Sequence, residues 1–444
     1  MRWAAIAVML LGLTGGCGDD EGPPSLLLDA TVEAGRDAGP TDGGTGDRDG
    51  NVDVDAGGGV DGGVDGGGER DAGPGSDGGP LPTCSPTEVL SVAVGPAHTC
   101  AVRADSVLFC WGTNDHGELG LADTVARLTP TRLDAFGSTW SSVTAGSSFT
   151  CGIAMGMALC WGHNMYGRLG VGDTDDRSFP AQVMGADSVV TVSAGGFHAC
   201  AIQTLVGGLL ACWGHNPDGR VGAGDTVDHW TGARVELSRT WTKVTAGGSH
   251  TCAVATDRTL RCWGGNSDGQ LGLGTFGSGT ERTTPQQVGT EAVWVDVSAG
   301  TTHTCAVRMD GSLWCWGSNA LDQLGLGPAG PARATSPTRV GTESGWSQVS
   351  AGAFRTCAVR ADGTLWCWGA NGLGELGVGD TMDRDVPTRV GTESTWTFVQ
   401  TRAIHTCGLL ARRLMCWGGN RDGELGTGDT TGSLVPIPAC VPAP

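Results

Sequence analysis

Residues 303–319 read HTCAVRMDGSLWCWGSN, a stretch that holds two cysteines, a turn signal and a Trp-Gly pair. Antiparallel pairing that sets Cys305 opposite Cys315 leaves Met309–Gly311 as a three-residue loop. Glycine in the left-handed position of such a loop is a common way to close a β-hairpin. Cysteines directly opposite each other on neighbouring strands lie within reach of a disulfide. The stretch therefore predicts a hairpin of two short strands joined by a disulfide.

The stretch is one copy of a repeat that recurs along the chain. Its Trp-Gly-x-Asn signature occurs seven times, at steps of 49–53 residues. The tryptophans of the signature are Trp111, Trp161, Trp213, Trp263, Trp316, Trp368 and Trp417. A fixed period near fifty residues indicates a propeller or a solenoid, and the units contain short β-rich runs broken by Gly and Asp-Gly. Four short strands per unit make a propeller blade. The sequence thus predicts an all-β, seven-bladed β-propeller over residues 84–444.

Paired cysteines occur in all seven repeats, which indicates an oxidised, extracytoplasmic protein. The six further pairs are Cys100–Cys110, Cys151–Cys160, Cys200–Cys212, Cys252–Cys262, Cys357–Cys367 and Cys407–Cys416. The differences in spacing fall in the predicted turn, where changes of length are tolerated. The separations are too long for the closely spaced cysteines of structural zinc sites. We therefore predict seven hairpin disulfides.

Cys84 and Cys440 stand at the two ends of the repeat region. A propeller must join its first blade to its last, so we predict a Cys84–Cys440 disulfide that closes the ring. In the chain-entropy treatment, closing so long a loop stabilises the fold by about 4–5 kcal/mol.

The first 17 residues have the features of a bacterial lipoprotein signal. Arg2 precedes the apolar run 4–13, and small residues at 14–16 lead into Cys17. About ten apolar residues are too few to span a membrane. We predict a signal peptide over residues 1–16, lipidation of Cys17 and attachment to the membrane by that lipid alone. The alternative is an ordinary signal peptide that is cut nearby.

Residues 17–83 form a second compositional segment, rich in Gly and Asp. Sixteen acids stand against three arginines over residues 19–83. Such a segment buries too little apolar surface to fold, and its charges repel one another. We predict a disordered acidic tether. The whole chain has a formal net charge of −20, which argues against a nucleic-acid partner because such binding needs clustered Lys and Arg.

The unit W-G-x-N-x-x-G-x-L-G-x-G-D-T, preceded by A-G-x-x-H-T-C-A-V and D-G, resembles the repeat of the regulator of chromosome condensation family. The resemblance covers residues 84–444 and implies a seven-bladed propeller. In that family the position after His-Thr is usually not cysteine, so the hairpin disulfide is a departure. The name-giving member acts on a nuclear GTPase and chromatin, and an anchored, disulfide-bonded, acidic chain should meet neither. A secreted bacterial member that inhibits a β-lactamase indicates that the loop face of such a propeller binds protein.

A histidine recurs at one position of five repeats and raises the question of a metal site. The five residues are His98, His198, His250, His303 and His405. Phe149 and Arg355 take this position in the other two repeats, and one residue per blade spreads the side chains around the ring. We interpret the histidines as structural residues bonded to backbone groups, and we expect neither a metal nor a cofactor.

Four aspartates follow Gly-x-Gly in their repeats and are interpreted as turn caps, which accept hydrogen bonds from backbone N–H groups. They are Asp173, Asp225, Asp380 and Asp429. Nothing in the chain resembles a nucleophile elbow or a Ser-His-Asp order. The sequence therefore predicts no catalytic residue.

Partner binding is expected where the repeats depart from their common pattern. The segment 225–236, DTVDHWTGARVE, carries His229 and Trp230, which we predict to anchor a partner. The function that fits best is a monomeric cell-envelope lipoprotein, expected at the outer membrane, whose propeller binds an envelope or extracellular protein or polysaccharide. Two alternatives remain open. One is an extracytoplasmic hydrolase or lyase with side chains converging near the propeller axis, and the other is an inhibitor of a secreted enzyme with a concave, aromatic-rich loop face.

Overall fold

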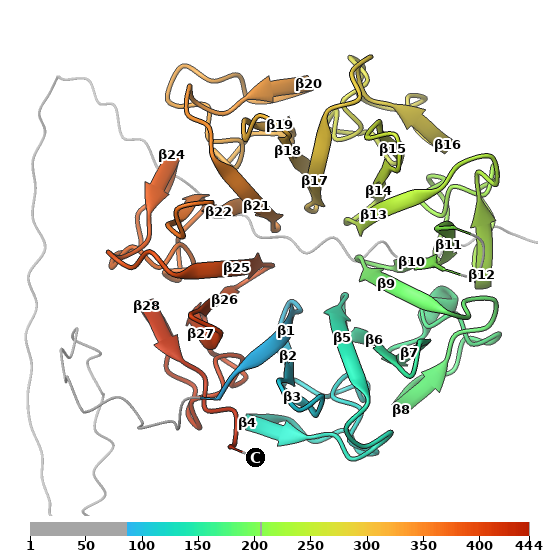
Figure 1. The fold of residues 1–444 in the computed structure, drawn as a ribbon, viewed down its shortest axis with the longest axis vertical. Coiled ribbons are helices and arrows are strands. Elements are labelled where there is room, and N and C mark those ends of the chain that lie inside the picture. Colours follow the sequence, from blue (N-terminus) through green and yellow to red (C-terminus); the bar gives the residue numbers. More distant parts are fainter. Residues whose placement is uncertain (1–86, 205–206, 444) are drawn as a thin grey trace, which may run out of the picture. The chain divides into compact units, whose positions relative to one another are not determined.

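The computed structural model describes residues 87–204 and 207–443, which form seven four-stranded antiparallel sheets arranged in a ring (Figure 1). In every sheet the strands follow chain order from the axis to the rim. This arrangement confirms the predicted seven-bladed propeller. The predicted signal peptide, Cys17, the acidic linker and Cys84 lie outside the described residues. Within the described ranges, no helix has the length and hydropathy needed to cross a membrane.

Each blade contributes one strand to the wall of the axis and one to the rim. The innermost strands are β1 (Val89–Val94), β5 (Trp140–Ala145), β9 (Val189–Ala194), β13 (Trp241–Ala246), β17 (Trp294–Ala299), β21 (Trp346–Ala351) and β25 (Trp396–Thr401). The outer strands are β4 (Arg127–Arg132), β8 (Arg177–Gln182), β12 (His229–Val235), β16 (Arg282–Gln287), β20 (Arg333–Arg339), β24 (Arg384–Arg389) and β28 (Ser433–Pro438).

The two central strands of each blade form the hairpin that was predicted from residues 303–319. The second strands are β2 (His98–Arg103), β6 (Phe149–Ala154), β10 (His198–Gln203), β14 (His250–Ala255), β18 (His303–Arg308), β22 (Arg355–Arg360) and β26 (His405–Leu410). The third strands are β3 (Leu108–Gly112), β7 (Met157–Gly162), β11 (Leu209–Gly214), β15 (Leu260–Gly264), β19 (Leu313–Ser318), β23 (Leu365–Gly369) and β27 (Arg413–Gly418). A short 3-10 turn, η1 (Met165–Gly167), follows β7.

The predicted register of the hairpin is confirmed. Cys305 pairs with Cys315 across β18 and β19. Gly311 has a φ of +74°, and its N–H donates to the carbonyl oxygen of Arg308 at 2.9 Å. The three residues between Arg308 and Ser312 therefore form the turn, with glycine in the left-handed conformation that a side chain disfavours.

The structure forms the seven hairpin disulfides. They join Cys100 to Cys110, Cys151 to Cys160, Cys200 to Cys212, Cys252 to Cys262, Cys305 to Cys315, Cys357 to Cys367 and Cys407 to Cys416. Cys440 is disulfide-bonded as well, while its expected partner Cys84 lies outside the described residues. The Cys84–Cys440 bridge therefore stays a prediction.

The tryptophan of each Trp-Gly-x-Asn signature joins its blade to the preceding one. All seven indoles are buried. Their Nε1–H groups donate at 2.8–3.0 Å to the backbone carbonyl oxygens of Glu424, Glu118, Arg168, Arg220, Gln270, Gln323 and Glu375, in chain order of the tryptophans. An indole that is both packed and hydrogen-bonded fills the space between blades without leaving a buried donor unpaired.

The recurring histidines also bond across blades, although not to the backbone groups that we predicted. Each is buried, and its Nε2 lies 2.7–2.9 Å from a threonine hydroxyl of the next blade. The pairs are His98–Thr150, His198–Thr251, His250–Thr304, His303–Thr356 and His405–Thr99. Each threonine donates its single proton to a backbone carbonyl, so the imidazole Nε2–H must be the donor in these pairs. The histidines thus connect blades one to another around the ring.

The exception in the second blade follows from the same geometry. Phe149 stands where the histidine would be, and Ala199 stands where the next blade's threonine would be. Both are buried in one apolar cluster. Replacing both partners of a buried hydrogen bond leaves no unpaired polar group, whereas replacing one would.

The wall of the axis is built mostly from small polar and apolar side chains. At every blade boundary a side-chain oxygen of one inner strand accepts a backbone N–H bond from the next, as Ser91 accepts from Val143 at 3.3 Å. At one end of the inner strands Arg402 reaches across the axis, and its Nη2 donates to the carbonyl oxygens of Ala145 and Ala194 at 3.0 and 2.5 Å. The polar groups of the axis are therefore used to hold the blades together.

Candidate functional site

The loops that join the third and fourth strands carry different side chains in different blades. In the Trp-Gly-x-Asn signature, the variable position is His163 in the second blade and His215 in the third. In the other blades it is a smaller residue, namely Thr113, Gly265, Ser318, Ala370 and Gly419. The asparagine that follows makes the same hydrogen bond in every blade: its Oδ1 accepts the N–H of the residue five positions on, which is Val221 in the third blade and a leucine in the other six. A common loop therefore presents titratable rings at one part of the propeller.

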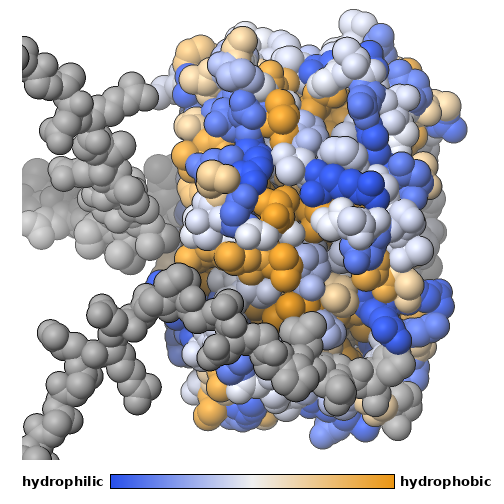
Figure 2. All heavy atoms as spheres, turned by 90° about the vertical axis from the view of Figure 1, so that its left-hand side faces the viewer, coloured by the Kyte–Doolittle hydropathy of each residue, from blue (hydrophilic) through white to orange (hydrophobic). Residues whose placement is uncertain are grey.

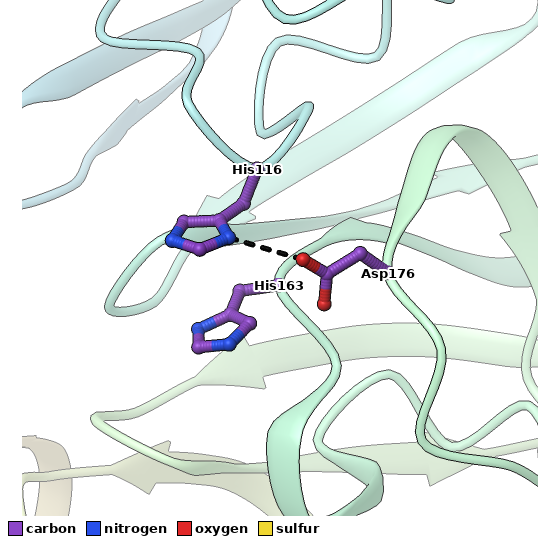
Figure 3. Close-up of side chains that lie close together, drawn as sticks. All are labelled: His116, His163 and Asp176. Carbon is purple, nitrogen blue, oxygen red and sulfur yellow. Dashed lines mark hydrogen bonds and ion pairs between the residues drawn. The ribbon is translucent and has the colours of Figure 1, made fainter.

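The first group of such side chains comprises His116, His163 and Asp176, drawn in Figure 3. The Nδ1 atom of His116 lies 3.0 Å from the Oδ2 atom of Asp176. The imidazole rings of His116 and His163 stack with centroids 4.0 Å apart and planes inclined by 14°. The group joins the first blade, which supplies His116, to the second blade.

Hydrogen bonds to backbone groups hold the two loops that carry these residues together. The N–H of Ala122 donates to the carbonyl oxygen of Ser178 in β8 at 2.8 Å, so the loop of the first blade is bonded to the second. Gly117 has a φ of +80° and lies so close to Ser178 that an added Cβ would fall 2.5 Å from its Cα. The other carboxylate oxygen of Asp176 accepts the N–H of Asn164 at 2.7 Å. Each side chain of the group is thus mounted on a fixed backbone.

A related group lies one blade further on. Tyr166 of the second blade stacks on His215 of the third, with centroids 3.9 Å apart and planes inclined by 25°. The Nδ1 atom of His215 lies 3.0 Å from Asp228 Oδ1, which also accepts the N–H of Asn216 at 2.8 Å. The second group therefore repeats the first, with tyrosine in place of one histidine.

A pocket of about 430 Å³ opens between the two groups. It is lined by His163, Met165, Tyr166, Thr174, Asp176, Asp228 and Trp230. Trp230, at the start of β12, is 49% exposed and packs one side against Gly167. The lining combines exposed aromatic rings with two carboxylates and includes neither lysine nor arginine. This volume is in the usual range for ligand pockets.

The electrostatics of the site keep its better-buried histidines neutral. Burial lowers the pKa of His163, and the nearby Arg168 and His116 lower it further. Burial also lowers the pKa of His215, with Arg220 adding to the effect and Asp228 opposing it. The neutral rings of His163 and His215 thus lie near the carboxylates of Asp176 and Asp228, with Arg168 and Arg220 as neighbouring cations.

Two other pockets of the structure lie in grooves between neighbouring blades, near the rim. One of about 300 Å³ between the fifth and sixth blades is lined in part by Trp346, Trp366 and Val386. A second, of about 240 Å³, occupies the equivalent place one blade on and is lined in part by Trp396 and Val435. Figure 2 views the propeller from the side that carries the sixth and seventh blades, where apolar side chains occur as short patches between polar ones. These grooves recur at equivalent positions and therefore follow from the repeat. A pocket of about 430 Å³ also recurs at the corresponding loop of the seventh blade, where Gly419 and Gly432 stand in place of His163 and Asp176. The pocket beside Trp230 is therefore distinguished by its side chains.

Of the two residues predicted to anchor a partner, Trp230 lines the pocket. His229 is not among the lining residues, and its Nε2 lies 3.0 Å from Asp225 Oδ1. The turn-capping interpretation of the four aspartates is confirmed, as Asp225 accepts the N–H of Val227 and the Nδ2–H of Asn216. Sequence reasoning missed the histidine and tyrosine groups. The signal that marks them is the histidine at the variable position of two signatures.

Comparison with known proteins agrees with this architecture. The regulator of chromosome condensation (RCC1) repeat matches residues 105–153, 156–202, 208–254, 262–307, 310–359 and 362–405. The chain is 31% identical over 318 residues to the ultraviolet-B receptor UVR8 of Arabidopsis thaliana, which covers 68% of this chain and 70% of the receptor. It is also 40% identical over 93 residues to the human probable E3 ubiquitin-protein ligase HERC3, but this match covers 20% of the chain and 9% of the ligase.

Solved structures give the same fold at lower sequence identity. Human WBSCR16 superposes with a TM-score of 0.65 at 21% identity, covering 76% of this chain and 94% of that protein. Yeast RCC1 (Prp20), in its complex with Kap60, superposes with a TM-score of 0.66 at 20% identity, covering 81% and 84%. These structures share the propeller fold. The repeat matches and the identity to UVR8 place the chain in the regulator of chromosome condensation (RCC1) repeat family.

Proposed function

We propose that the protein is a lipid-anchored, extracytoplasmic binding module that captures a protein partner at the pocket beside Trp230. The envelope location is supported by the sequence signals at residues 1–17 and by the hairpin disulfides, because disulfides form and persist outside the reducing cytoplasm. The acidic segment 17–83 serves as the tether that displays the propeller.

The observation that carries this proposal is the break in repeat symmetry around the pocket. Positions that hold small residues in other blades hold His163 and His215 here, and both rings are stacked and hydrogen-bonded. Exposed aromatic rings beside polar groups are the side chains that most often dominate the binding energy of an interface. A rigid scaffold that bears one group of unusual loops is a common arrangement for recognition.

The chemistry of the pocket favours a basic side chain of the partner. Tyr166 and Trp230 are 38% and 49% exposed, and Asp176 and Asp228 lie at the same pocket. An arginine or lysine that enters the pocket meets aromatic faces and two carboxylates, and it is attracted by both. A partner with an exposed basic segment is therefore the expected ligand.

The proposal is tested by using the purified full chain as bait for solubilised cell-envelope proteins. The Tyr166→Ala/Trp230→Ala variant should lose the captured partner. The matched control is Phe276→Ala, because Phe276 is 52% exposed and lies outside the pocket. Capture that survives the double substitution, or that is lost equally in the control, would contradict the proposal. Binding of envelope polysaccharide without protein would assign the pocket to a glycan instead.

A further inference from the structure

We propose that His116, His163 and Asp176 form a binding site for a divalent transition metal ion of the zinc type. The site shares His163 and Asp176 with the pocket beside Trp230, and its test does not depend on whether that pocket binds a protein. It adds a ligand that the sequence did not indicate, because its donors come from two blades and lie up to 60 residues apart.

The distances between the candidate ligand atoms are the first support for this site. One ligand atom from each of the three side chains lies within 4.8 Å of the other two. Around a tetrahedral zinc ion with ligands at about 2.0–2.2 Å, the ligand atoms lie about 3.4 Å apart. His116 Nδ1 and Asp176 Oδ2 are already 3.0 Å apart. A metal ion lies in the plane of each imidazole that binds it, so the His163 ring, which is stacked on His116 and partly exposed, must rotate out of the stack to complete the set.

The donor types select the metal. Two imidazole nitrogens and one carboxylate oxygen suit zinc, copper or nickel, whereas calcium and magnesium prefer sets of oxygen ligands. Three protein ligands leave a fourth position open, as in zinc sites that bind water or an external ligand. His116 and Asp176 are 39% and 43% exposed in their side chains, so this position is open to solvent or to a donor from a partner.

The surroundings hold His116 and Asp176 in place before an ion arrives. Asp176 keeps one carboxylate oxygen on the N–H of Asn164, so the other oxygen stays directed at His116. The backbone N–H of His116 donates to Glu118 Oε2 at 2.8 Å, which fixes the loop that carries the imidazole. Hydrogen bonds that orient metal ligands in this way raise affinity by ten- to a hundredfold in known sites, as an order of magnitude.

Equivalent positions elsewhere in the ring lack the donors. Between the sixth and seventh blades the corresponding residues are Leu373, Gly419 and Gly432, which line a pocket of about 430 Å³. Between the second and third blades Tyr166 replaces the first histidine, so His215 and Asp228 are the remaining donors. Among the described residues, the group of the first two blades is the one that brings three such ligands together.

The test is isothermal titration of the oxidised full chain, first treated with a chelator, with zinc chloride in the absence of thiol reductants. We expect one site, with affinity weakened about tenfold or more in His116→Ala and in His163→Ala. His215→Ala is the matched control, because His215 is also stacked on a ring and bonded to an aspartate. It should bind zinc as the unchanged chain does.

A second measurement separates loss of a ligand from loss of structure. Cobalt(II) in place of zinc gives ligand-field absorption bands that report the coordination, and these bands should be absent in both histidine variants while near-ultraviolet circular dichroism is unchanged. The proposal is overturned if the unchanged chain does not bind zinc, if either variant binds it equally well, or if His215→Ala causes the same loss.

Discussion

The Nε2 atom of His405 in the last blade lies 2.7 Å from the hydroxyl oxygen of Thr99 in the first blade. The same pair of residue types joins four other blade boundaries, so the ring closes with the contact that is used inside it. Trp111 adds a bond from its indole N–H to the carbonyl oxygen of Glu424 at 2.8 Å. The described part of the ring closes through these side-chain contacts and through backbone hydrogen bonds such as that from the N–H of Val89 to the carbonyl oxygen of Arg412 at 2.9 Å. A Cys84–Cys440 disulfide would reinforce them.

Thr99→Ala should destabilise the propeller by about 1–3 kcal/mol, because it leaves the Nε2–H of His405 buried without an acceptor. Adding His405→Phe should recover part of this loss, since Phe149 and Ala199 form the equivalent pair in the second blade. Denaturant unfolding of the two single variants and the double variant measures the coupling. Additive effects of the two substitutions would contradict this account of the boundary.

The hairpin disulfides should each stabilise the fold mainly through the unfolded state. Replacing Cys305 and Cys315 together by alanine opens a loop whose ends are 10 residues apart, and the free energy of unfolding should fall by about 2–3 kcal/mol. Thermal or chemical denaturation of this variant, compared with the unchanged chain under oxidising conditions, gives the value. An unchanged midpoint of the unfolding transition would show that this disulfide does not stabilise the fold.

Peptide mapping without reductant tests the bridge that lies partly outside the described residues. Linked peptides containing Cys84 and Cys440 are expected, together with the seven hairpin pairs. Near this end of the chain Arg103 of β2 donates to the carbonyl oxygen of Pro442 at 2.6 Å, so the C-terminal residues contact the first blade. A free thiol at Cys84, or its pairing with a different cysteine, would remove the predicted ring closure.

Acidification should destabilise the propeller at pH values well above those at which carboxylates titrate. Burial lowers the pKa of His250, His303 and His405 to about 3 and that of His98 to about 4. In the unfolded chain these imidazoles bind protons near pH 6.5. Above that pH their ionisation does not reduce the free energy of unfolding. As the pH falls from about 6.5 toward 3–4, the unfolded chain binds more protons than the folded one, so the free energy of unfolding decreases progressively. At pH 5.5 the loss is on the order of 1 kcal/mol for each histidine.

Denaturant unfolding at pH 7.5 and at pH 5.5 checks the sign of this effect. The His405→Phe/Thr99→Ala variant is the control, because it has one fewer buried imidazole and should lose less stability between the two pH values. Equal stability of the unchanged chain at both values would contradict the assignment of neutral, buried histidines.

The anchor is tested by Cys17→Ser, which removes the thiol that would carry the lipid. The substituted chain should move from the membrane fraction to the soluble fraction, since a run of about ten apolar residues does not span a bilayer. Membrane association that is unchanged by the substitution would contradict lipid anchoring.

Much of the scaffold was predictable because its determinants are local. Cys305, Gly311 and Cys315 lie within one hairpin, so strand pairing and turn chemistry decide the register together. The role of His98 was not predicted, because its partner Thr150 lies 52 residues away in the next blade. One sequence feature does indicate this contact: where Phe149 replaces the histidine, Ala199 replaces its threonine partner.

Of the candidate site, only Trp230 was predictable from the sequence. Trp230 stood out as a large aromatic residue in an unusual loop, and it does line the pocket. His116 and His163 belong to different repeats, and the distance between their rings depends on how two blades pack. Reading each repeat separately does not reveal a contact that is made between repeats.

The most direct test of the binding proposal is to place a photo-crosslinking phenylalanine analogue at Trp230 in the anchored full chain and to irradiate intact cell envelopes. We predict a discrete crosslinked protein that is absent when the same analogue stands at Phe276, and that is lost when the pocket is altered by Tyr166→Ala. No crosslinked protein at Trp230, or the same products from both positions, would contradict the assignment of this pocket as the partner site.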